Sequence, residues 1–144
     1  MVNVEKLEVR HIQELISSGA QRIRAEIIPE EMKAVCQQPF AYAFIDDQGK
    51  IIGAAGAVEL WSNRSELWAM LDRESGKHMV SIHRTVVKIL KILPFRRLEA
   101  TVDKDFEQGH RWVKLLGFTM EAETLRAYNP DGRDSSLYAL IKEP

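Results

Sequence analysis

The sequence predicts an α/β (α+β) fold in a single domain, residues 1–144, with a mixed, twisted sheet of about seven strands and helices on both faces. Three observations support this fold class. Residues 79–93 carry apolar side chains at spacings of three and four, which is the pattern of an amphipathic helix. Residues 98–120 have the pattern of a strand, a loop, a helix, a glycine and another strand. Shorter segments of alternating character supply the remaining strands.

In the first half of the chain, one strand, two helices and three further strands are expected. Residues 4–9 predict the first strand, and a short helix follows from His11 until Gly19, a residue that readily adopts the left-handed conformation after a helix. The second helix begins at Pro29, because proline suits the first helical position. Three antiparallel strands follow at residues 40–45, 50–61 and 66–71.

In the second half, the order is helix, strand, helix, strand and strand. After the helix of residues 79–93, a strand covers residues 98–102 and the next helix stops at Gly117. A turn at residues 129–132 separates the closing strands, residues 120–128 and 136–142. The side chains expected in the core include Ile82, Val86, Leu90, Trp112 and Leu115.

Composition excludes several classes of partner. A net charge of −1 gives no global attraction for nucleic acid or for an acidic membrane surface. The single cysteine, Cys36, cannot form an internal disulfide, which favours a reducing compartment. The longest apolar run, residues 51–58, is far shorter than the ~20 residues of a membrane span. We therefore expect a cytoplasmic protein with no nucleic-acid or membrane partner. The four histidines are scattered without ligand spacing, so no metal is expected.

Residues 109–118, GHRWVKLLGF, are the most informative stretch of the chain. They predict a helix that ends at Gly117, followed directly by a strand that begins at Phe118. This unit resembles the C-terminal half of the GNAT superfamily of CoA-dependent N-acyltransferases, and the predicted order of elements is also the GNAT order. The resemblance implies transfer of an acetyl or acyl group from acetyl-CoA, as co-substrate, to an amine.

By resemblance, the cofactor site is expected at the loop between the strand of residues 66–71 and the following helix. The GNAT loop has Arg or Gln, two residues, Gly, one residue, and then Gly or Ala. Arg73 and Gly76 are in register with it, but His78 stands where the small residue belongs. A helix N-terminus suits the negative pyrophosphate of CoA. The expected cofactor-binding residues are Leu71, Arg73, Ser75, Gly76, Lys77 and His78.

The same loop also has features that oppose anion binding. Asp72 and Glu74 place carboxylates there, and each can cost on the order of 1 kcal/mol beside a phosphate. The alternative interpretation is that Asp72 or Ser75 simply caps the helix.

Amine acylation needs a base and often an acid for the leaving thiolate. The tyrosine that serves as the family acid is replaced by Val113, so no acid can be assigned by resemblance; Tyr128 and Tyr138 are other tyrosines in the second half of the chain. The candidates for the catalytic base are Glu59, Glu66 and Glu26. Glu59 and Glu66 can instead be ordinary exposed strand residues, and Glu26 can instead form an ion pair with Arg22, four residues away if that stretch is helical.

A narrower resemblance keeps a second class of function open. The segment of residues 22–26, Trp68, the degenerate loop and the pair Arg111 and Trp112 resemble small GNAT-fold proteins of phages and prophages, among them internal virion proteins. That resemblance implies a catalytically degenerate structural protein, in the host cytoplasm or the virion. Besides acetyl-CoA and the amine, the partner expected is a second copy of the chain or a phage-particle component.

Overall fold

The computed structural model describes residues 2–22 and 29–143. In chain order its elements are β1 (Asn3–Lys6), α1 (Val9–Ser17), β2 (Gln21–Arg22), α2 (Pro29–Gln37), β3 (Phe40–Ile45), β4 (Ile51–Trp61), β5 (Arg64–Leu71), the 3₁₀ turn η1 (Ser75–His78), α3 (Met79–Ile92), β6 (Arg97–Asp103), α4 (Glu107–Leu115), β7 (Thr119–Leu125) and β8 (Ser135–Ile141).

The strands form one mixed sheet in the order β1-β3-β4-β5-β6-β8-β7, and the two-residue β2 pairs with β5. The pairs β1–β3, β3–β4, β6–β8 and β7–β8 are antiparallel, whereas β5 and β6 are parallel. The predicted fold class is therefore confirmed. β2 escaped the sequence analysis because two residues are too few to show a periodicity.

The chain divides into two compact units, and two of the boundaries between them fall inside β4 and β5. The first consists of Met1–Gln21, Ile27–Ala57 and Ala69–Leu93, and the second of Arg22–Glu26, Val58–Trp68 and Pro94–Pro144. That residues 1–144 are a single domain stays a prediction.

In the first unit, β1, β3 and most of β4 lie side by side. Here β1 ends at Lys6 rather than at Val9, because a helix N-terminus forms instead. Glu8 and His11 make a reciprocal capping box, in which the Nδ1 atom of His11 accepts a hydrogen bond from the Glu8 amide at 3.0 Å. Gly19 follows α1 with a φ of 74°, as its predicted role requires. The core side chains Ile82, Val86 and Leu90 of α3 are buried as predicted.

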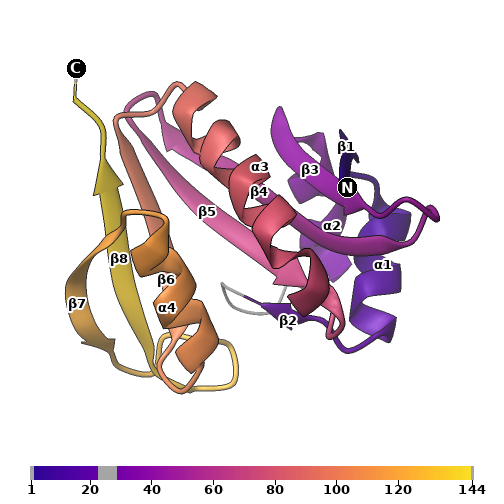
Figure 1. The fold of residues 1–144 in the computed structure, drawn as a ribbon. Helices are drawn as coiled ribbons and strands as arrows, with labels where there is room; N and C mark the ends of the chain where they lie inside the picture. The colour runs from indigo at the N-terminus through magenta and orange to yellow at the C-terminus, as the bar shows by residue number, and fades with distance from the viewer. Residues whose placement is uncertain (1, 23–28, 144) are drawn as a thin grey trace. The chain divides into compact units, whose positions relative to one another are not determined.

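In the second unit, β6, β8 and β7 lie side by side and α4 packs on β6 (Figure 1). A Cβ atom on Gly109 would lie only 2.9 Å from the Cγ1 atom of Val102, so this glycine lets α4 approach the strand closely. Trp112 is buried as predicted, but Leu115 is 75% exposed, so its assignment to the core was wrong. Leu115 lies about 200° around the helix from the buried Val113, which places it on the opposite face. None of the described helices has the length and apolar character needed to cross a membrane.

Candidate active site

The loop that follows β5 is organised by a buried aspartate. The carboxylate of Asp72 is 4% exposed and accepts a hydrogen bond from the Glu74 amide at 3.1 Å, while the Asp72 carbonyl accepts one from the Ser75 amide at 3.0 Å. Burial by itself raises the pKa of Asp72, but the bonds from the Glu74 amide and the Ser18 side chain, together with the charge of Lys50, outweigh it. The net effect is a lowered pKa. Asp72 therefore holds the loop as an ionised carboxylate.

Lys50 offsets the acidic character of this loop. Its ammonium lies 3.5 Å from the carboxylate of Asp72 and 3.2 Å from that of Glu74. Both contacts raise the pKa of Lys50, with the hydrogen bond to Glu74 as the largest cause. The two carboxylates expected to repel a phosphate are thus paired with a cation that the sequence analysis did not identify.

Gly76 lies on the open side of the loop. It is exposed, and a Cβ atom built on it would meet no other atom within 4 Å. Its φ is not positive, so the backbone at this position does not require glycine. Nothing in the described protein therefore explains why this residue is small, whereas a ligand that approaches the backbone closely would explain it.

The other residues of the predicted cofactor site surround Gly76 in the first unit. Ser75 is buried, Leu71 and His78 are half-buried, and Lys77 is exposed. The chain turns through η1 before α3 begins at Met79. The amides of Glu74 and Ser75, which precede Gly76 in this turn, both donate to Asp72.

Arg73 lies against the end of α1. Its Nε atom donates to the carbonyl oxygen of Gly19 at 3.3 Å, and a Cβ atom on Gly19 would lie 3.0 Å from the same nitrogen. A guanidinium at a helix C-terminus interacts favourably with the last carbonyl groups. The structure thus gives Arg73 a contact within the protein, which the motif did not reveal.

Two of the three candidate bases belong to the strands β4 and β5. Glu59 is exposed near the end of β4, and Glu66 is half-buried on β5, where it lies opposite Glu99 in the parallel register with β6. Glu26 lies outside the described residues. Glu59 and Glu66 both belong to the second unit.

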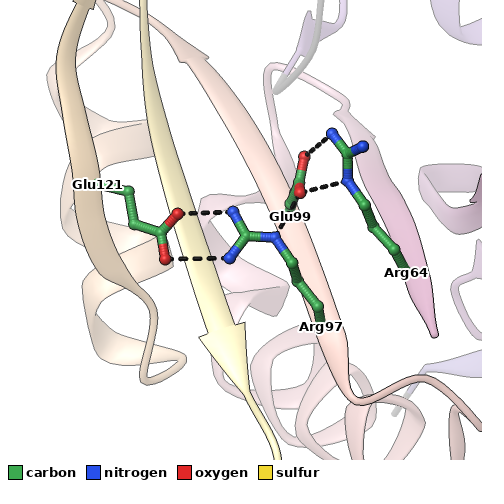
Figure 2. Close-up of polar contacts among 4 residues, drawn as sticks. All are labelled: Arg64, Arg97, Glu99 and Glu121. Atoms are coloured by element: carbon green, nitrogen blue, oxygen red, sulfur yellow. Dashed lines mark hydrogen bonds and ion pairs between the residues drawn. The ribbon is translucent and has the colours of Figure 1, made fainter.

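A ladder of four charged side chains, those of Arg64, Glu99, Arg97 and Glu121, lies in the second unit (Figure 2), and the sequence analysis missed it. The carboxylate of Glu99 accepts two hydrogen bonds from Arg64, from Nε at 2.5 Å and from Nη2 at 2.8 Å. It also accepts one from the Nε atom of Arg97 at 2.5 Å. Arg97 also makes a two-pronged contact with Glu121, at 2.6 and 3.1 Å. The bonds from Arg64 lower the pKa of Glu99 although burial opposes them. A signal existed in the sequence: Arg97 and Glu99 are two residues apart on one strand, and so share a face.

The second unit also contains a histidine and tyrosine pair at the start of α4. The Nε2 atom of His110 lies 3.1 and 3.0 Å from the carbonyl oxygens of Asp103 and Lys104, so this nitrogen carries the hydrogen. Nδ1 then accepts the hydroxyl hydrogen of the fully buried Tyr138 at 2.7 Å. Burial raises the pKa of Tyr138. This geometry joins β6, α4 and β8, and it directs the Tyr138 hydrogen at His110.

Val113, at the position of the family tyrosine, is 2% exposed. A tyrosine there would have to fit a filled core.

Comparisons with known proteins identify the fold. Solved structures that share it include one described provisionally as a phosphinothricin N-acetyltransferase, with 14% identity, complete coverage of both chains and a TM-score of 0.75. Ard1 from Thermoplasma volcanium has 12% identity, 99% coverage of both chains and a TM-score of 0.78. A single-residue variant of the spermidine N-acetyltransferase SpeG from Vibrio cholerae has 15% identity, covers 97% of this chain and 93% of its own, and has a TM-score of 0.71.

The chain therefore has the GNAT-like fold of these N-acetyltransferases. No protein-family model matches the sequence, and no curated protein matches it either.

Proposed function

We propose that the protein is an acetyl-CoA-dependent N-acyltransferase. In the proposed reaction, the amine nitrogen attacks the thioester carbonyl, the carbon–sulfur bond breaks, and the CoA thiolate leaves. A base takes the proton that the amine loses. The GNAT-like fold supports this proposal, and the observation that carries it is the open surface at Gly76 beside the first turn of the helix after β5.

In this proposal, the backbone amides around Gly76 hold the pyrophosphate, and Lys77 and Arg73 contribute positive charge. Asp72 does not oppose the phosphate as an isolated charge, because it is buried and held by Lys50 and by the amide of Glu74. The base is one of the three candidate carboxylates, Glu59, Glu66 or Glu26. The acyl acceptor is an amine.

Acetyl-CoA binding tests the proposal. Acetyl-CoA at a hundred times its dissociation constant should stabilise the fold by ~2.7 kcal/mol, a rise of several degrees in melting temperature. Gly76→Val should leave the melting temperature of the free protein within about 2 °C of the wild-type value, because the new side chain meets open space. The same change should abolish the rise in melting temperature with acetyl-CoA. Arg73→Glu should also abolish it.

Glu74→Gln is the matched control on the same loop. It removes an exposed carboxylate, so the rise with acetyl-CoA should persist or increase. Unchanged melting of the wild type at millimolar acetyl-CoA would contradict the proposal.

A second candidate is a GNAT-fold protein that no longer transfers acyl groups, including the phage structural class. The buried Val113 in place of an acid favours it. A wild type that binds acetyl-CoA but acetylates no amine would support this second function.

A further inference from the structure

Three buried polar side chains in the second unit have no hydrogen-bond partner among the residues that the structure describes. They are the hydroxyl of Ser65 and the indole nitrogen of Trp68, both on β5, and the hydroxyl of Thr101 on β6; Trp68 and Thr101 lie on one face of the sheet and Ser65 on the other. Trp68 is 2% and Thr101 is 3% exposed. Folded proteins pair nearly all such groups, so two on neighbouring strands call for an explanation.

The side chains of Trp68 and Thr101 share one face of the sheet. In the β5–β6 register Glu66 lies opposite Glu99, and the last registered pair is Leu67 with Ala100. Trp68 and Thr101 each lie two residues beyond Glu66 and Glu99, so they project to the same side of the sheet as those carboxylates. Val102 contacts the position of Gly109, so α4 covers the other face.

The chemistry of this face selects its ligand. An indole nitrogen is only a donor, and a threonine hydroxyl can donate as well, so both groups can be satisfied by a ligand oxygen. The Glu66 carboxylate on the same face attracts a cationic amine. The ladder arginines cannot take the place of that ligand oxygen, because guanidinium groups only donate.

We infer that this face binds the acceptor amine, and that the acceptor carries a carbonyl or carboxylate oxygen next to its amine, as amino acids and their amides do. Trp68 and Thr101 donate to that oxygen and so determine specificity. This inference rests on the proposed function. A protonated polyamine such as the spermidine named for SpeG offers only donors, so it can donate to the Thr101 hydroxyl but leaves the indole N–H of Trp68 unsatisfied.

Direct binding without acetyl-CoA tests the inference separately from acyl transfer. Calorimetry should compare alaninamide with sec-butylamine, which has a similar shape but lacks the carbonyl, and with spermidine. Wild type should bind alaninamide in preference to both amines. Trp68→Phe and Thr101→Val remove one donor each, and Thr101→Val also keeps the shape of the side chain; each should weaken alaninamide binding about fivefold.

Ser65→Ala is the matched control. Its hydroxyl is also buried without a partner among the described residues, but Ser65 lies on the face opposite to Trp68, so alaninamide affinity should not change. Because Thr101→Val keeps the side-chain shape and loses no bond to the described residues, it should also leave the melting temperature of the free protein unchanged or raised. Trp68→Phe leaves a cavity and should lower that temperature, so only its affinity is compared.

Three results would overturn the inference. One is a lowered melting temperature of Thr101→Val with unchanged alaninamide affinity in both variants, which would indicate a structural partner such as an internal water. Another is equal affinity of the wild type for alaninamide and sec-butylamine. The third is absence of alaninamide binding at millimolar concentration. If the acetyl-CoA melting shift persists in that last case, the proposed function stands and only the acceptor assignment fails.

Discussion

Replacing Glu99 with Gln tests whether the charged ladder stabilises the second unit. The Glu99 side chain is 8% exposed, whereas those of Arg64 and Arg97 are 31% and 26% exposed. Breaking a buried ion pair typically costs 3–5 kcal/mol. Both arginines here can reach water, Arg97 keeps Glu121, and glutamine keeps one acceptor oxygen. We therefore expect a loss of about 2–3 kcal/mol in the free energy of unfolding.

Urea denaturation at pH 7, followed by circular dichroism, measures this loss. The control is Glu121→Gln, which removes the outer carboxylate of the same ladder. Its side chain is 41% exposed, so that change should cost less than about 1 kcal/mol. A loss below 0.5 kcal/mol for Glu99→Gln, or equal losses for the two variants, would refute the reasoning.

The pH dependence gives a second readout of the same group. The folded-state pKa of Glu99 is lowered from its ordinary value of 4.5, with the bonds from Arg64 as the largest cause. A carboxyl with a depressed folded pKa contributes stability above its unfolded pKa and loses it as the pH falls through the folded value. The stability difference between wild type and Glu99→Gln should be constant above about pH 5.5 and shrink below about pH 4.5. A difference that stays constant down to pH 3 would contradict this assignment.

Two further changes test the packing and hydrogen bonding around α4 by the same denaturation assay. Gly109→Ala should lower the free energy of unfolding by about 1–3 kcal/mol, because its Cβ atom would lie 2.6 Å from the Phe106 ring and 2.9 Å from Val102. An unchanged free energy of unfolding would show that the helix can move away from the strand. Tyr138→Phe should lower the free energy of unfolding by about 1–3 kcal/mol, because it removes the hydroxyl that donates to His110. An unchanged free energy of unfolding would mean that His110 finds another hydrogen-bond partner.

Short-range patterns explain which parts of the fold could be predicted. The helix α3 was found because its apolar spacing is complete within 14 residues, and the end of α4 because Gly117 follows it directly with a φ of 100°. The exposed Leu115 shows the limit of the same method. Spacings of three and four from Trp112 predict both Leu115 and Leu116, and only packing decides which lies toward the core.

Long-range contacts explain what was missed at the candidate site. The loop that we propose as the cofactor site could be named from the sequence because its motif is contiguous there. The contact of Arg73 with Gly19 spans 54 residues, and that of Arg64 with Glu99 spans 35. No local pattern specifies such pairs, because they depend on which strands become neighbours. That Trp68 and Thr101 lack a hydrogen-bond partner among the described residues could not be read from the sequence for the same reason.

Release of CoA thiol from acetyl-CoA in the presence of an amine panel tests the central claim most directly. With an acceptor such as alaninamide, the wild type should release thiol well above the rate of the uncatalysed reaction. Gly76→Val should abolish this release while the protein stays folded, because the new side chain occupies the open space beside the loop backbone. Thiol release that is absent for every amine, or that is unchanged in Gly76→Val, would contradict an N-acyltransferase acting through this loop.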